Sequence, residues 1–385
     1  MQGKATLAYL ALTLSLITIS ARATNNMLLT TLPPFARYVL RLSNIDVGLL
    51  MATVFVSTFV ATTLLNPILG RWTRTAFVTS NMFIFLSMFL FYLSSSLTVW
   101  IISALTGFAS GLVFPNMITA ASAAKDARSV EQLLAIYTTG LSASLVAGPL
   151  FETWLLGFIG YREVFLPFSA VAFVAALTSF YVRFPQISGR HRRSSALLSK
   201  GFLASVLSNA TYAVPFAAIT TFLVIYASER FGVSKELAYF AFIPFFSVSF
   251  ATRLLIALFP RRSLLPTFIS SASITIAALL AFDFVNTYPL FLLLSAALGY
   301  PHGSIYPMST IIIARSTPVE MRGAVNSYFS ATGNLIFITV PVIVGYISHY
   351  IGLGTSFLML CLPVIATFSV FLIKYGRDSM LLSVW

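Results

Sequence analysis

Residues 103–115 read SALTGFASGLVFP and residues 295–307 read SAALGYPHGSIYP, so two distant stretches of this chain share one pattern. The offset between them is 192 positions, which is half of the 385-residue chain to within one residue. The same offset persists downstream, where Pro149 matches Pro341. Self-similarity at this period predicts two structurally equivalent halves. Each stretch also carries two glycines at the Gly-x-x-x-Gly spacing that favours close helix packing in membranes, at Gly107 and Gly111 and at Gly299 and Gly303.

The composition places both halves in a lipid bilayer. Hydrophobic residues make up 58% of the chain, charged residues only 9%, and the mean hydropathy is +0.92. A soluble domain carries about 25% charged residues, so this chain lacks the polar surface to face water on all sides. A helix needs about 20 apolar residues to cross the hydrocarbon core. We expect twelve transmembrane helices, at 6–32, 45–69, 76–96, 98–122, 131–157, 163–183, 200–227, 236–259, 264–284, 288–314, 322–346 and 354–374.

One polar stretch interrupts this pattern at the middle of the chain, where residues 185–195 read PQISGRHRRSS. We predict an all-α membrane protein of two pseudo-symmetric six-helix bundles, residues 1–184 and 199–385, joined by a cytoplasmic linker at 185–198. Because each half has an even number of helices, both halves enter the membrane in the same sense. Parallel repeats of this kind occur in duplicated membrane transporters.

The net charge of +13 invites a nucleic-acid function, but the basic residues lie in short connectors rather than along one soluble face. Connectors on the inner side of the predicted topology hold most of them, including Arg71, Arg74, Arg315 and Lys374. This is the positive-inside bias, and it predicts a multi-pass protein of the cytoplasmic membrane with both termini in the cytoplasm. The inner basic residues are expected to contact anionic lipid head groups, and no nucleic-acid partner is expected.

The N-terminal run raises the alternative of a cleaved signal peptide, because Ala21-Arg22-Ala23 resembles a processing site. The apolar run continues past these residues to Leu32, which is too long for a signal peptide, so we expect it to remain as the first span. Cys361 is the single cysteine, which excludes an intramolecular disulfide.

Short motifs in the chain resemble those of the major facilitator superfamily of transporters. Residues 70–74 read GRWTR, similar to the family's Gly-x-x-x-Asp-Arg-x-Gly-Arg-Arg connector; Gly70 and the basic Arg71 match it, and Arg74 stands at the aspartate position. Gly148-Pro149 is similar to the glycine-flanked Gly-Pro of antiporter-type members. The resemblance covers nearly the whole chain. It implies two bundles around a central cavity, alternating access, a monomeric state, and neither enzymatic activity nor a cofactor.

Arg22 is the candidate that we single out for substrate binding. It falls near the middle of the first span, where a charged side chain costs about 2.5–3.5 kcal/mol and is expected to face a wet cavity or a partner. It belongs to a polar stripe at helical spacing, with Asn25 beside it: Ser15, Thr18, Arg22, Asn26 and Thr30. A guanidinium flanked by amides suits carboxylate or phosphate. The alternative is an ion pair with a buried acid such as Glu152, and the two roles are compatible.

Glu152 is the only acid well inside a predicted span. Desolvation favours its neutral form and a nearby arginine favours the carboxylate, so this group is the candidate for carrying a transported proton. A solvated position near the outer end of its helix, or a fixed structural role, is the alternative.

The second half supplies further candidates for substrate contact. His302 precedes Tyr306 by four residues, so both are expected on one helix face, and a histidine inside a span can bind substrate or relay protons. Arg253 at the inner end of its helix resembles a family arginine, although snorkelling to the interface is an alternative. The full set in this half is Asn209, Tyr212, Arg253, Tyr300, His302 and Tyr306.

Together these features predict a secondary active transporter of a small organic solute, with an organic anion as the first choice because of Arg22. Protons are the candidate coupling ion. The alternative is proton-linked efflux of hydrophobic or cationic compounds, favoured by the Gly148-Pro149 motif and an aromatic content of 15%. Metal clusters, nucleophile triads and phosphate-binding glycine loops are not recognisable in the sequence.

Overall fold

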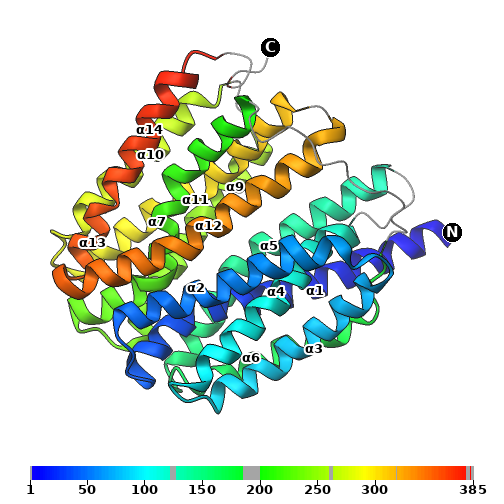
Figure 1. The fold of residues 1–385 in the computed structure, drawn as a ribbon, viewed down its shortest axis with the longest axis horizontal. Coiled ribbons are helices and arrows are strands. Elements are labelled where there is room, and N and C mark those ends of the chain that lie inside the picture. The colour runs from blue at the N-terminus through cyan, green and yellow to red at the C-terminus, as the bar shows by residue number, and fades with distance from the viewer. Residues whose placement is uncertain are drawn as a thin grey trace. The chain divides into compact units, whose positions relative to one another are not determined.

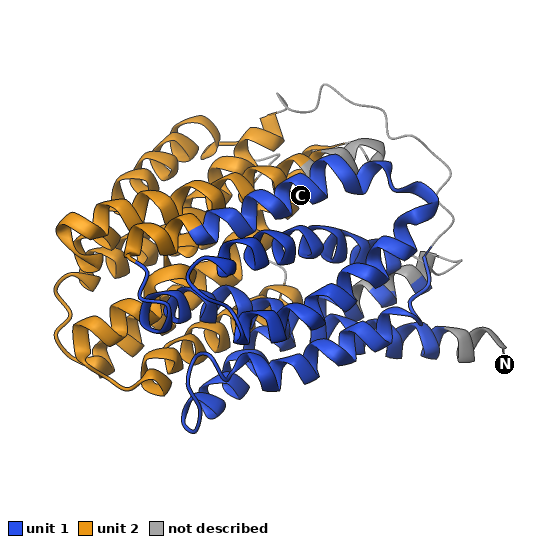
Figure 2. Cartoon of the chain, turned by 60° about the horizontal axis from the view of Figure 1, so that its bottom comes forward, with its two compact units in different colours: residues 1–42, 50–189 blue, residues 43–49, 190–385 orange. Residues whose placement is uncertain are grey.

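The computed structural model describes residues 2–121, 127–184, 200–259, 263–317, 319–378 and 382. It is all-helical over these ranges (Figure 1). The chain forms two compact units, coloured separately in Figure 2, of which unit 1 comprises residues 1–42 and 50–189 and unit 2 comprises residues 43–49 and 190–385. The predicted linker at 185–198 lies outside the described residues.

Unit 1 is built from six α-helices. In chain order they are α1 (Gln2–Pro34), α2 (Asn44–Val60), α3 (Thr73–Tyr92), α4 (Thr98–Ala121), α5 (Ala127–Leu156) and α6 (Phe165–Ser179), and the first residues of α2 group with unit 2. Within the unit, α1 packs against α5 and α6, and α3 packs against α4 and α6. A buried apolar cluster fills the space between them and includes Ile17, Phe77, Val113 and Met117.

Unit 2 contains eight labelled helices. They are α7 (Lys200–Phe231), α8 (Lys235–Phe240), α9 (Phe242–Leu258), α10 (Leu265–Phe282), α11 (Tyr288–Ser316), α12 (Val319–Ile351), α13 (Leu353–Met359) and α14 (Cys361–Tyr375). α11 packs against α7, α9 and α10, and α7 also contacts α12 and α14. α7 and α11 are therefore the inner helices of this unit.

The repeated glycines make the same contact in both units. A Cβ added at Gly107 of α4 would lie 2.2 Å from the carbonyl oxygen of Val54 in α2, and one added at Gly299 of α11 would lie 2.2 Å from that of Phe245 in α9. In unit 1 the hydroxyl of Thr58 also donates to the carbonyl of Gly107 at 2.9 Å. Glycine is required at both places because the neighbouring backbone occupies the space of a side chain.

Two of the predicted spans are broken by proline. Pro244 has no amide hydrogen to donate to the carbonyl of Phe240, and α8 ends at Phe240. Pro363 stands in the same relation to Met359, at which α13 ends. α8 with α9, and α13 with α14, thus each form one bent rod.

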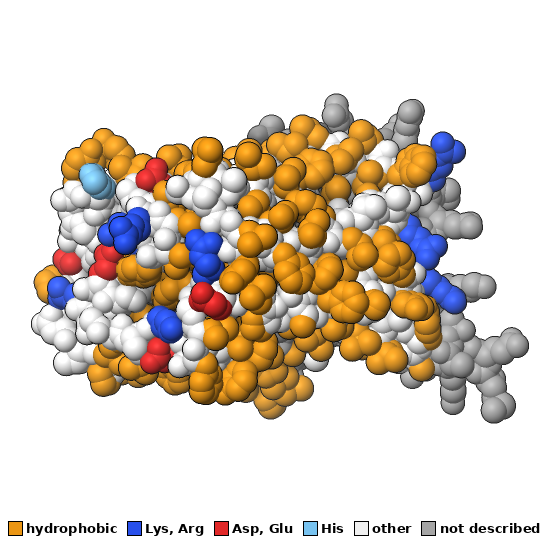
Figure 3. All heavy atoms as spheres, turned by 90° about the horizontal axis from the view of Figure 1, so that it is seen from below, with side chains coloured by type: hydrophobic (Ala, Val, Ile, Leu, Met, Phe, Trp, Pro, Cys, Tyr) orange, Lys and Arg blue, Asp and Glu red, His pale blue; other side chains and the backbone are white. Residues whose placement is uncertain are grey.

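Counting each bent rod once, the described residues form twelve helical rods. Their ends lie within five positions of the predicted ones, except that α2 ends at Val60, nine residues before the predicted end at 69, and is followed by short non-α turns up to Ile68. Nine of these rods are long and apolar enough to cross a membrane, and α5, α6 and α11 complete the twelve. Hydrophobic side chains cover much of the face in Figure 3, and large ones such as Ile373 and Leu362 are strongly exposed. The prediction of an all-α membrane protein with twelve helices is confirmed, and nine of these helices are candidate spans over the described ranges.

The connector between α2 and α3 shows what Arg74 does in place of an acid. Gly70 adopts φ +47°, the left-handed region that favours glycine, and begins a short 3-10 turn. Arg74 then donates from Nη2 to the carbonyl of Phe180 at 2.9 Å, directly after the end of α6. Terminal carbonyls of a helix lack partners within it, so Arg74 joins α3 to α6. Arg71 lies over the ring of Trp72, 5.4 Å from its centroid.

Candidate functional site

Arg22 lies in the middle of α1 and is half-buried. Its Nη2 donates to the hydroxyl of Tyr137 in α5 at 2.6 Å. Its guanidinium carbon lies 4.2 Å from the ring centroid of Phe114 in α4. Among the described residues, the guanidinium is thus held by a phenol and by an aromatic face, the second a cation–π contact, and it forms no salt bridge there.

One further donor of this guanidinium, Nε, is buried and unsatisfied among the described residues. A buried donor without a partner is costly, about 1–3 kcal/mol and more when it is charged. A ligand that accepts hydrogen bonds and carries negative charge would therefore stabilise Arg22 most.

Glu152 is fully buried in α5, so the alternative of a solvated position near the helix end is wrong. The partner of Arg22 on α5 is Tyr137, which precedes Glu152 by fifteen residues, or about 22 Å along a helix axis. The guanidinium therefore binds at a different level of α5 from Glu152.

The polar stripe on α1 is only partly accessible. Asn25 and Asn26 are half-buried, one turn beyond Arg22, whereas Thr18 is fully buried. Thr30 is also buried and returns its hydroxyl to the carbonyl of Asn26 at 2.7 Å. Arg22, the two amides and the half-buried Ser15 are thus the members of the stripe that can reach a solute.

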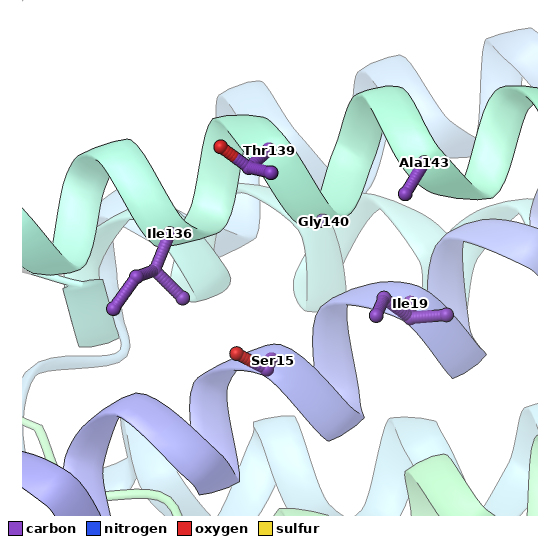
Figure 4. Close-up of a pocket in the computed structure, with 6 residues that line it drawn as sticks. All are labelled: Ser15, Ile19, Ile136, Thr139, Gly140 and Ala143. Carbon is purple, nitrogen blue, oxygen red and sulfur yellow. The ribbon is translucent and has the colours of Figure 1, made fainter.

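A groove of about 320 Å³ opens between α1 and α5 (Figure 4). Ser15 and Ile19 line it from α1, and Ile136, Thr139, Gly140 and Ala143 line it from α5. The helices approach closely beside it, because a Cβ at Gly140 would lie 3.2 Å from Cγ2 of Thr18.

Gly148 and Pro149 lie further along α5. A Cβ at Gly148 would be 3.7 Å from Cα of Ala23, which is ordinary van der Waals contact. Gly148 therefore marks where α5 passes α1, but the space there would accept a methyl group. Pro149 follows inside the continuous helix.

In unit 2, His302 of α11 stands in a box of aromatic rings and is 7% exposed. Its Nδ1 lies 2.7 Å from the hydroxyl oxygen of Ser249 in α9, within hydrogen-bond distance. Ring centroids lie between 4.3 and 5.7 Å from that of the imidazole, and they belong to Tyr212, Phe216, Phe245 and Phe246. A polar partner on one ring nitrogen orients the imidazole within an apolar surround.

Arg253 of α9 extends toward α11. Its Nη2 lies 3.5 Å from the carbonyl oxygen of His302. Nε of Arg253 and the hydroxyl of Tyr212 are buried without hydrogen-bond partners in the part of the chain that the structure describes. Arg253 and Tyr212 thus place several hydrogen-bond donors around His302 in unit 2.

The remaining candidates of unit 2 lie apart from this position or at its edge. Asn209 is buried in α7, one turn before Tyr212. Tyr300 exchanges a hydrogen bond with Ser270 of α10 at 2.9 Å. Tyr306 is 48% exposed and packs against Phe329, so the four-residue spacing from His302 does not give the two side chains the same surroundings.

Sequence reasoning missed the residues that hold Arg22 and surround the imidazole of His302: Phe114, Tyr137, Phe216, Phe245, Phe246 and Ser249. The only available signal was the repeat, in which Phe114 corresponds to Tyr306. Within the described ranges, no group of three or more His, Cys, Asp or Glu side chains is placed to hold a metal.

The sequence and the structure were compared with known proteins. A sequence model described as Major Facilitator Superfamily matches residues 14–278 and 254–380. No curated protein matches the sequence. A bacterial homologue of the human lysosomal transporter Spinster, in an inward-facing and occupied conformation, is similar over 97% of each chain, with 15% identity and a TM-score of 0.70.

Two further structures are similar over almost the whole chain. A mutant of the nucleoside transporter NupG is 14% identical over 95% of this chain and 100% of its own, with a TM-score of 0.72. A mutant of the peptide transporter POT is 12% identical over 97% of this chain and 95% of its own, with a TM-score of 0.76. At such identities the likeness shows the fold alone.

Proposed function

The chain belongs to the major facilitator superfamily, and on that premise we propose that it moves a small organic anion by alternating access, gripping the anionic group with Arg22. Members of this family are secondary transporters of small solutes and are not enzymes, as its motifs predicted. The observation that supports this proposal is the environment of Arg22, whose polar and cation–π contacts among the described residues are with the Tyr137 hydroxyl and the aromatic rings of Phe114 and Tyr137. A cation held by uncharged groups in a membrane helix attracts an anion.

The second group of substrate contacts in this proposal lies in unit 2. Tyr212, Arg253 and His302 gather hydrogen-bond donors on an otherwise aromatic surface. Asn25 and Asn26 in unit 1 and Asn209, Tyr300 and Tyr306 in unit 2 are the further proposed contacts. Aromatic walls with a few convergent polar groups are the usual composition of small-molecule sites.

Proton coupling through Glu152 is the second part of the proposal. Its support is the complete burial of this carboxyl in α5, because a charged carboxylate in a membrane helix is costly and a protonated one is not. Loading and release of a proton would then accompany the change of access. Gly148 and Pro149, just before it, are the proposed bending point of the same helix.

We further propose that the protein lies in the cytoplasmic membrane as a monomer with both termini inside. The support is the positive-inside distribution of basic connectors such as the one holding Arg71 and Arg74. In the same proposal, the N-terminal bundle ends at 184 and the C-terminal bundle begins at 199.

The test uses the full chain reconstituted in proteoliposomes and a panel of labelled carboxylates and phosphates. Arg22→Ala is expected to reduce uptake at subsaturating substrate by tenfold or more, and Arg22→Lys to restore it in part, because it keeps the charge but loses the planar fork. Lys374→Ala, which removes an exposed cation at the end of α14, is the matched control and should leave uptake unchanged.

The same assay distinguishes anion transport from the alternative function, which is efflux of hydrophobic or cationic compounds. If anions are not moved, and hydrophobic cations are exported at a rate that Arg22→Ala leaves unchanged, the anion proposal is wrong and multidrug-type efflux takes its place.

A further inference from the structure

The groove between α1 and α5 lies on the face of α1 that carries Arg22. Positions 15, 19, 22 and 26 are spaced by four, three and four residues, which places them on one side of a helix. Ser15 and Ile19 line the groove, and Arg22 follows Ile19 by one turn. The groove and the guanidinium are therefore neighbours along one surface of unit 1.

The α5 side of the groove is joined to Arg22 as well. Ile136 and Gly140 line it, and between them in sequence lies Tyr137, whose hydroxyl accepts the hydrogen bond from Arg22. Figure 4 shows Ile136 and Ala143 of α5 and Ile19 of α1 along the seam between the two helices. Residues that line the groove, Ile19 on α1 and Ile136 on α5, are thus within one helical turn of Arg22 and of its partner Tyr137.

The lining suits hydrocarbon rather than a second charge. Its six residues carry no ionisable side chain, and Ile19 is 40% exposed, so the groove is open to a visiting molecule. Its volume of about 320 Å³ is at the lower end of ligand pockets, which span about 300–1,000 Å³.

We propose that this groove receives the apolar body of the transported anion, so that the substrate is an amphiphilic carboxylate or phosphate with a short hydrocarbon or ring portion. This inference rests on the proposed role of Arg22 as the anion site. The charged group fixes the solute at Arg22, and burial of its carbon portion between Ile19, Ile136 and Ala143 adds affinity in proportion to length.

The experiment measures dissociation constants of straight-chain monocarboxylates, from butyrate to octanoate, by calorimetry on the full chain in lipid nanodiscs. In the wild type the Kd is expected to fall by up to about fourfold per added methylene until the groove is full. Ala143→Leu inserts three carbons into the groove, so octanoate should bind at least tenfold more weakly while butyrate binds as before. Ala170→Leu, which adds the same carbons on an exposed face of α6, is the matched control and should change neither value.

A second variant guards against a packing defect in Ala143→Leu. Ile19→Ala deepens the groove at an exposed position, and the length at which affinity levels off should move to longer chains. If butyrate binds in an Arg22-dependent manner but the chain-length profiles of wild type, Ala143→Leu and Ile19→Ala coincide, the groove does not receive the carbon portion of the solute and the inference is overturned. If no carboxylate of any length binds through Arg22, the proposed function itself fails, and this inference fails with it.

Discussion

Replacing Gly107 or Gly299 by alanine tests whether each half depends on the same kind of close contact between two helices. In each case the new Cβ would lie 2.2 Å from a carbonyl oxygen, about 1.2 Å closer than the 3.4 Å at which ordinary contact begins. The obstacle is backbone, so the whole helix must move. Overpacking of this kind costs about 1–3 kcal/mol. Alanine recovers up to about 1 kcal/mol through its better helix propensity.

In unit 1 the displacement also strains the hydrogen bond from Thr58 to the Gly107 carbonyl, a bond worth about 1 kcal/mol. We therefore expect Gly107→Ala to lose about 1–3 kcal/mol of unfolding free energy, and Gly299→Ala, without the hydrogen-bond contribution, to lose up to about 3 kcal/mol. Because α4 also carries Phe114, Gly107→Ala should weaken anion binding in addition.

The assay is denaturant unfolding of the full chain in mixed micelles, followed by circular dichroism. Gly333→Ala is the matched control, because its Cβ would meet no atom within 4 Å, and alanine in an open helical position should stabilise by up to about 1 kcal/mol. The reasoning is refuted if Gly107→Ala and Gly299→Ala unfold at the same denaturant concentration as Gly333→Ala.

Three further substitutions probe the sites. Tyr137→Phe removes the hydrogen bond to Arg22. Because a hydrogen bond to a charged group contributes about 1.5–3 kcal/mol, the KM for anion uptake should rise about tenfold with little change in maximal rate. An unchanged KM would show that Tyr137 does not take part in the site. Ser249→Ala leaves the imidazole of His302 without its Nδ1 partner and should lower the free energy of unfolding by about 1–3 kcal/mol; equal denaturation midpoints would contradict the hydrogen bond. Glu152→Gln should abolish uptake driven by a pH gradient while exchange of substrate across the membrane persists, and gradient-driven uptake at the wild-type rate would exclude a proton role for this carboxyl.

Much of the fold could be predicted because a membrane leaves few alternatives. Segments of about 20 apolar residues have no stable arrangement in water, so the positions of the spans follow from hydropathy. The breaks at Phe240 and Met359 follow from Pro244 and Pro363 four residues later, but hydropathy does not detect them, since the segments stay apolar throughout.

The site was less predictable, and the residues show why. Arg22 stands out because a charge in an apolar run is costly, yet its partners are a phenol and a phenyl ring, which have no charge signature in a sequence rich in aromatic residues. Reasoning from charge pointed to Glu152 as the partner of Arg22. Helical spacing likewise put His302 and Tyr306 on one face, whereas packing of α7 and α9 covers His302 and leaves Tyr306 exposed.

The surroundings of position 22 in the membrane test the central claim most directly. In a Cys361→Ala background, Arg22→Cys would be treated with a membrane-impermeant, water-soluble thiol reagent applied to either side of oriented vesicles. We predict that the new thiol at position 22 reacts with this reagent from at least one side of the membrane. A thiol at position 22 that no aqueous reagent reaches from either side would mean that the native guanidinium faces dry protein or lipid, and the account of Arg22 as an anion site would be contradicted.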